Sequence, residues 1–147
     1  MRRFAFRLEH VLNLRRARED AALAELASAR RTLALEQMAL EQRRARARRA
    51  LQEARRRREQ GEDPALAAGL TVFLEALEDD VRLQEEAVSM AEEEVQSRLQ
   101  AALEAMKERK AMEKLRERRL AEHLAEAARE DIRAMDEAAA LRAASNR

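Results

Sequence analysis

The sequence predicts an all-α fold in which two long helices form an antiparallel coiled-coil hairpin. Three observations predict it: 40% of the 147 residues are charged, only 2% are aromatic, and all helix-breaking residues lie in one short segment. Alanine and leucine set among arginine and glutamate are typical of long helices and coiled coils, because these residues are strong helix formers. The same helix formers, recurring at helical spacing, favour ordered helices over the disorder that so much charge would otherwise indicate.

The helix-breaking residues divide the chain into two predicted helices. Gly61, Pro64 and Gly69 are the only glycines and the only proline, and they lie close together. We predict a single coiled-coil domain over 1–147 with three parts: a helix over 4–60, a turn over 61–70 and a helix over 71–143.

The start of the second helix can be placed at two positions. Asp63 followed by Pro64 is typical of an N-cap and a first helical turn, which places the start at Pro64. Gly69 could instead delay the start to Thr71. Gly61 is suited to end the first helix, because glycine readily adopts the left-handed conformation found there.

Apolar residues recur every seven residues in both predicted helices. The first ladder is Leu12, Leu26, Leu33, Leu40, Ala47 and Ala54, with Glu19 as its exception. The second ladder is Leu74, Val81, Val88, Val95 and Ala102. A four-residue step from Val95 to Leu99 indicates a stutter, where the supercoil locally unwinds. Such ladders on both sides of a short turn predict that the helices pack together in antiparallel orientation.

Complementary charge blocks support this pairing. Residues 43–58 contain nine arginines and one glutamate, whereas residues 75–94 contain nine acidic residues and one arginine. A chain that folds back near residue 65 places the basic block along the acidic one, which disfavours a parallel homodimer. Each exposed pair contributes only about 0–1 kcal/mol, so the apolar seam must supply most of the stability. We expect a monomeric hairpin, although a domain-swapped dimer that opens at 61–69 would bury the same seam.

The second helix is predicted to extend beyond the first. The fold-back near residue 65 places Phe4 near residue 126, which leaves Ile132, Met135 and Leu141 without a partner in the chain. An unpaired amphipathic helix end is a candidate docking site, and a frayed tail is the alternative.

The sequence contains no catalytic or metal-binding pattern. Neither His10 nor His123 has a second histidine or a cysteine at ligand spacing, and no glycine-rich phosphate loop is present. Acidic pairs such as Asp79–Asp80 lie on exposed helix faces, without the pocket that would shift the pKa of a catalytic carboxylate. We therefore expect no enzymatic activity, no catalytic residues, no metal and no cofactor. The hairpin would bring the two histidines close, so a shared metal or a pH switch is the alternative to two solvated side chains.

Charge and hydropathy limit the class of partner. The net charge is +1, which argues against a general binder of nucleic acid or of anionic membranes. The arginines within 43–58 leave a nucleic-acid-associated coiled coil as an alternative. No stretch approaches the roughly 20 apolar residues of a membrane span, and Met1–Leu14 lacks the apolar run of a signal peptide. With no cysteine, the chain fits a reducing compartment. We expect a cytoplasmic protein that binds other proteins.

The opening residues resemble those of a known family. The pattern Phe4-x-Phe6-x-Leu8-Glu9-x-Val11-Leu12-x-Leu14-Arg15, followed by Glu19, resembles the start of the FliJ family, small coiled-coil proteins of the bacterial flagellar type III export apparatus. Two later stretches look similar to that family as well: Phe73-Leu74-x-x-Leu77-x-x-x-Val81-x-x-Gln84, and Met112-Glu113-Lys114-Leu115-x-Glu117-Arg118. The chain departs from the family at His123 and Phe73, where tyrosine is common.

The resemblance implies a function and a set of partners. Family members are antiparallel coiled coils similar to the central stalk of rotary ATPases. One copy associates with the hexameric export ATPase and promotes ring assembly and activity. Members also contact the export-gate membrane protein and some export chaperones, which implies peripheral association with the inner face of the cell membrane at the flagellar base. The alternatives are the equivalent stalk of a virulence type III secretion system and a cytosolic chaperone or escort for exported substrates.

The resemblance also implies two contact regions. The end that carries both termini would enter the ATPase ring, through Phe4, Arg7, Leu8, Val11, Ile132 and Met135. The part nearer the turn would face the export gate, through Met38, Leu40, Phe73 and Leu77. Leu8, Leu40 and Leu77 could equally be seam residues.

Overall fold

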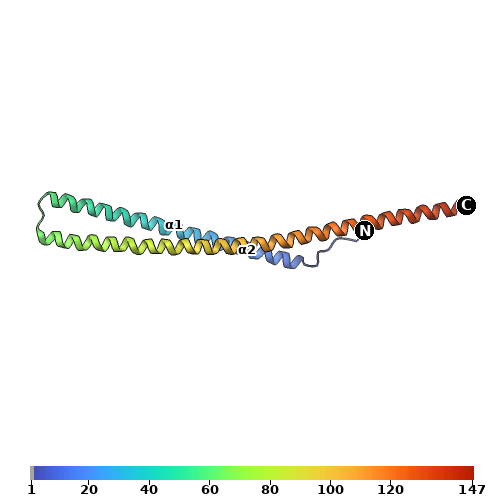
Figure 1. Cartoon of the computed structure of the whole chain (residues 1–147), viewed down its shortest axis with the longest axis horizontal. Coiled ribbons are helices and arrows are strands. Elements are labelled where there is room, and N and C mark those ends of the chain that lie inside the picture. Colours follow the sequence, from blue (N-terminus) through green and yellow to red (C-terminus); the bar gives the residue numbers. More distant parts are fainter. Residues whose placement is uncertain (1) are drawn as a thin grey trace. The chain divides into compact units, whose positions relative to one another are not determined.

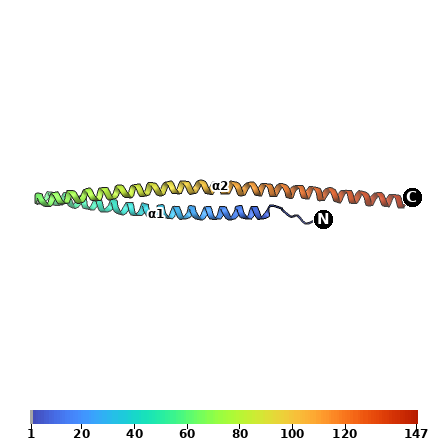
Figure 2. The same cartoon turned by 90° about the horizontal axis from the view of Figure 1, so that it is seen from below.

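The computed structural model describes residues 2–147, and these residues form two α-helices and no strands (Figure 1). Helix α1 spans Glu9–Glu59 and helix α2 spans Pro64–Ser145. Segments of the two helices run side by side in opposite directions, as Figure 2 also shows. The predicted all-α helical hairpin is therefore confirmed.

The chain is made of two compact units. The turn unit contains Ala21–Ala102, and the terminal unit contains the described residues up to Asp20 together with Leu103–Arg147. Each unit consists of a segment of α1 packed against a segment of α2.

The turn between the helices is shorter than the sequence predicts. It occupies residues 60–63, and Gly61 has a φ of +80°. This left-handed conformation ends α1 after Glu59, and a residue with a Cβ atom adopts it only at a cost. The predicted fold-back near residue 65 is therefore wrong by a few residues.

A side-chain cap fixes the start of α2. The backbone N–H of Ala65 donates a hydrogen bond to Oδ1 of Asp63 at 3.1 Å, and Pro64 occupies the first helical position. The predicted start at Thr71 is wrong, because this cap lies upstream of Gly69, which is part of the helix. The alternative start at Pro64 is the one observed.

Helix α1 begins at Glu9, so its predicted start at Phe4 is wrong as well. Residues 2–8, the terminal strap, are not helical, and the N–H of Glu9 donates to the carbonyl of Phe6 at 3.1 Å. The N-terminal end of a helix carries a partial positive charge, which favours an acidic residue there and disfavours arginines such as Arg3 and Arg7.

The heptad ladders form the seam in both units. The buried apolar residues are Leu12, Leu26, Ala29, Leu40 and Ala54 in α1, and Leu77, Val88, Ala91 and Ala102 in α2. Glu19, the exception in the first ladder, is buried at the same spacing, and Gln84 is buried in α2. These two polar residues therefore occupy seam positions.

Burial along α2 keeps the seven-residue spacing across Val95, from Val88 to Ala102, so the predicted stutter stays a prediction. Val95 and Leu99 are both half-buried, and the buried Ala102 follows them. The seven-residue spacing from Ala102 then continues through Arg109 and Arg116, which are also half-buried. Polar residues therefore take over part of the seam in the terminal unit.

Candidate partner-binding surfaces

A central ion pair lies inside the seam of the terminal unit. The guanidinium of Arg109 pairs with the carboxylate of Glu19 and, at 2.6 Å, with that of Glu113. The side chains of Arg109 and Glu19 are only 22% and 11% exposed. The hydrogen bond with Glu19 raises the pKa of Arg109 above its ordinary value.

Further ion pairs join α1 and α2 in the same unit. Arg15 pairs with Glu108 at 2.6 Å, and Arg116 pairs with Glu9 at 3.0 Å. Because these side chains are partly exposed, each pair contributes little to stability on its own. Together with the Arg109 pair they fix the register of the two helices in a seam with few apolar layers.

The terminal strap is held against α2 through Phe4. The ring centroids of Phe4 and His123 lie 5.5 Å apart, and the guanidinium of Arg116 lies 5.8 Å from the centre of the Phe4 ring. The Nε2 atom of His123 donates a hydrogen bond to the carbonyl oxygen of Arg2 at 3.0 Å. His123 therefore contacts the strap, whereas His10 is exposed.

Within residues 2–147 no group of three or more histidine, cysteine or acidic side chains could hold a metal ion.

A groove of about 770 Å³ opens beside the strap. Its apolar lining comes from Phe4, Ala5, Phe6, Leu8 and Leu115, and its polar lining from four arginines and one histidine: Arg2, Arg3, Arg7, Arg119 and His123. We call it the strap groove. Among residues 2–147, no carboxylate lines it. The groove brings together Phe4, Arg7 and Leu8 from the predicted site, while Val11 is half-buried one turn further along α1.

The end of α2 lies beyond the reach of α1. The predicted overhang is confirmed, because Ile132, Met135 and Leu141 are 59%, 71% and 72% exposed and have no partner among the described residues. Two residues of the predicted terminal contact region, Ile132 and Met135, therefore lie on the overhang rather than in the strap groove.

The predicted contact residues of the turn unit separate into two pairs. Leu40 and Leu77 are buried in the seam, which is the other role that the sequence left open for them. Met38 and Phe73 are 60% and 43% exposed, so they remain accessible to a partner.

The turn unit also exposes apolar side chains that the sequence analysis did not single out. Three of them are Leu35, Leu83 and Met90. Each lies two residues after a ladder position, as Leu35 does after Leu33, so the three occupy equivalent heptad positions. In an antiparallel pair of helices, equivalent heptad positions lie on the same side of the pair. The side-chain amide of Gln84 donates to the backbone carbonyl of Glu36 at 3.0 Å, which brings this part of α2 level with Leu35. We call these three residues and Met38, all of them exposed, the apolar face. In the sequence, these residues can be recognised as apolar side chains that lie outside the two heptad ladders.

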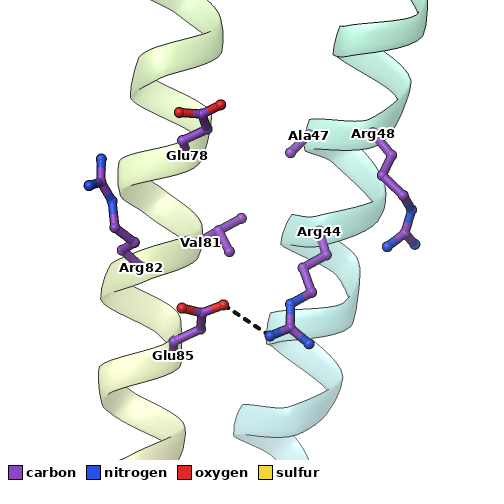
Figure 3. A pocket seen from close by; sticks show the side chains of 7 residues that line it. All are labelled: Arg44, Ala47, Arg48, Glu78, Val81, Arg82 and Glu85. Carbon is purple, nitrogen blue, oxygen red and sulfur yellow. Dashed lines mark hydrogen bonds and ion pairs between the residues drawn. The ribbon is translucent and has the colours of Figure 1, made fainter.

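Another face of the turn unit carries an open groove of about 470 Å³. Figure 3 shows Ala47 of α1 and Val81 of α2 directed toward each other across the seam, with Arg82 directed away from α1. Arg44 pairs with Glu85 at 2.9 Å beside them. Apart from Ala47 and Val81, the groove is lined by arginine and glutamate side chains.

The complementary charge blocks pair only in part. Arg43 pairs with Asp80 at 3.0 Å and Arg44 pairs with Glu85, which confirms that the blocks lie along each other. Other arginines pair within α1, and their hydrogen bonds lower the pKa of Glu53. Four arginines of the block make no ion pair within residues 2–147: Arg46, Arg49, Arg55 and Arg58.

No helix in the described part of the chain is long and apolar enough to cross a bilayer.

These features define a class of protein: a two-helix coiled-coil hairpin with open grooves and exposed apolar side chains along its surface. The family model described as the flagellar FliJ protein matches residues 4–147. The chain therefore belongs to the FliJ family of flagellar export-associated coiled-coil proteins, a non-catalytic family, and the resemblance found in the sequence is confirmed. Comparison with curated proteins and with solved structures gave no match.

Proposed function

We propose that the chain is a stalk-like component of the flagellar type III export apparatus. In this proposal it binds the hexameric export ATPase, promotes the assembly and activity of the ring, and links the ring to the export gate. The observation that carries the proposal is membership of the FliJ family over residues 4–147. The separation of the accessible surfaces into two units supports it, because each unit can serve a different partner.

The terminal unit is the proposed contact with the ATPase. It offers the strap groove, with Phe4, Arg7 and Leu8, and the overhang, with Ile132 and Met135. A single stalk in a six-fold ring cannot form six equivalent interfaces, so its contacts must be individually weak. Arginine side chains on a thin helical surface suit such contacts better than a large apolar surface does.

The turn unit is the proposed contact with the export gate. Its exposed Met38 and Phe73, together with Leu35 and Leu83 of the apolar face, are large side chains that a partner could cover. Solvent-exposed apolar clusters commonly mark protein interaction sites. In this arrangement the protein would lie peripherally at the inner face of the cell membrane, at the flagellar base.

The direct test is ATP turnover by the purified cognate export ATPase, with and without this protein. Wild type should stimulate turnover, whereas a Phe4→Ala/Leu8→Ala variant should not, because it removes two apolar side chains of the strap groove. Circular dichroism must show that the variant keeps its helices. If the wild-type protein neither stimulates the ATPase nor co-elutes with it, the stalk function is refuted.

A second candidate function is that of an escort for exported substrates or for their chaperones. The three exposed apolar side chains on the overhang favour it, since they leave an amphipathic helix end free for a client. Co-elution with several export substrates in the absence of the ATPase would support this function. Loss of that co-elution on removal of residues 128–147 would assign it to the overhang.

A further inference from the structure

We propose that the strap groove binds an acidic peptide segment of a protein partner, with its carboxylates on the arginine rim and one apolar side chain on the groove floor. This inference rests on the proposed function in one respect, namely that the export ATPase would supply the segment. The chemical class of the ligand follows from the residues that line the groove.

The floor of the groove is suited to a single apolar side chain. Phe4 and Phe6 come from the strap and Leu115 from α2, and both phenylalanines are only half-buried. Aromatic side chains that remain partly exposed in a concave surface gain stability when a ligand covers them. The volume of about 770 Å³ admits such a side chain together with a short stretch of backbone.

The rim of the groove is suited to carboxylates. Arg2, Arg3 and Arg7 make no ion pair within residues 2–147, and Arg119 pairs only with Glu122, at 3.2 Å. Because no carboxylate lines the groove, the positive charges are not neutralised from within. Guanidinium groups bind carboxylates in a planar, two-bond geometry, which gives the contact direction as well as attraction.

The surroundings favour a peptide over an extended anionic surface. Glu122 and Glu126 follow the rim residue Arg119 at helical spacing, hence on the same side of α2, and both are exposed. A flat anionic bilayer or a nucleic-acid backbone would meet these carboxylates, whereas a short segment that enters the groove would avoid them.

Contacts within the protein hold the groove in shape. The hydrogen bond from His123 to the carbonyl of Arg2 and the stacking of Arg116 on Phe4 tie the strap to α2. A ligand therefore meets a surface that is already formed, which lowers the entropic cost of binding.

The test uses the full chain and a fluorescently labelled peptide, Gly-Glu-Glu-Phe-Glu-Glu-Gly, followed by fluorescence anisotropy. Wild type should bind it with an affinity that falls as salt is added. The Arg3→Gln/Arg7→Gln variant should bind about tenfold more weakly, because two charge-assisted contacts are lost. The matched control, Arg46→Gln/Arg49→Gln, removes two unpaired arginines of the turn unit and should bind like wild type.

Two further peptides separate charge from apolar contact. One has glutamine in place of every glutamate, and the other has glycine in place of phenylalanine; both should bind clearly more weakly than the parent peptide. Equal loss in the Arg3/Arg7 variant and in the control variant would overturn the inference, since it would indicate diffuse attraction. Tighter binding of vesicles that contain anionic lipid than of the peptide, lost in the same Arg3/Arg7 variant, would overturn it in favour of a membrane site.

The outcomes also distinguish this inference from the proposed function. If the peptide does not bind while the ATPase is still stimulated, only the groove inference fails. If the peptide binds at the groove while the ATPase is neither bound nor stimulated, the ligand class stands and the proposed source of the segment is wrong.

Discussion

Arg109 of α2 forms an ion pair with Glu19 of α1 inside the seam of the terminal unit. Both residues stand at heptad positions that apolar side chains would normally fill. A buried pair of this kind is costly to desolvate, and the loss of one partner leaves the other charge uncompensated. We therefore expect Arg109→Leu to lower the free energy of unfolding, because the carboxylate of Glu19 then stays in the seam without its partner.

The double variant provides the control. Glu19→Leu/Arg109→Leu should be as stable as wild type or more stable, because two apolar side chains can then pack in the seam. Urea denaturation followed by circular dichroism measures both variants. A double variant less stable than the single one would contradict this account of the pair.

The two glycines should respond in opposite ways to the same substitution. Gly61→Ala should lower the free energy of unfolding by about 1 kcal/mol, because φ at this position is +80°. Gly69→Ala should raise it by about 0.5–1 kcal/mol, because Gly69 is helical and nothing lies within 4 Å of an added Cβ. Thermal unfolding of both variants tests the placement of the turn, and a change of the same sign at both positions would contradict it.

Salt should loosen the terminal unit more than the turn unit. The seam of the terminal unit relies on ion pairs such as those of Arg15 with Glu108 and of Glu9 with Arg116. Raising the salt concentration from about 0.1 M to about 1 M shortens the screening length from about 10 Å to about 3 Å. Amide hydrogen exchange should therefore accelerate over 9–20 more than over 26–40. Equal acceleration in the two segments would show that the ion pairs do not hold the terminal unit together.

The apolar face and the seam of the turn unit should separate binding from stability. Met38→Ala/Leu83→Ala should change the free energy of unfolding by less than about 1 kcal/mol, since both side chains are exposed, while weakening binding to the export gate. Leu40→Ala should cost about 2–4 kcal/mol, because Leu40 is buried in the seam. Gate binding measured by co-purification, together with urea denaturation, checks both. Unchanged gate binding in the Met38/Leu83 variant would move the gate contact elsewhere.

Much of the fold could be predicted from the sequence because heptad spacing is a local signal. The ladder that includes Leu12 and Leu40 identified the seam of α1, and Gly61 marked the turn. The start of α1 could not be predicted in this way. The non-helical strap that precedes it contacts His123, a residue distant in the sequence that the periodicity of α1 alone does not indicate.

The candidate sites could be predicted only in part, for a related reason. A search for apolar periodicity identifies Leu77 readily but passes over Gln84 and Arg109, which are polar members of the seam. Leu35 is apolar, yet its role depends on which side of the helix pair it faces, and that follows from the register of α1 against α2. The exposed Ile132 was predictable, because its position beyond the fold-back requires only the approximate place of the turn.

Cross-linking to the export ATPase tests the central claim most directly. The chain contains no cysteine, so single cysteines can be placed at two exposed positions, Asn13→Cys in the terminal unit and Gln60→Cys at the turn. Each variant would carry a thiol-linked photo-cross-linker and be mixed with the assembled ATPase ring. The account predicts cross-links to the ATPase from position 13 and none from position 60. Cross-links from position 60 alone, or from neither position in a complex that co-elutes, would contradict the claim that the terminal end of this protein enters the ring.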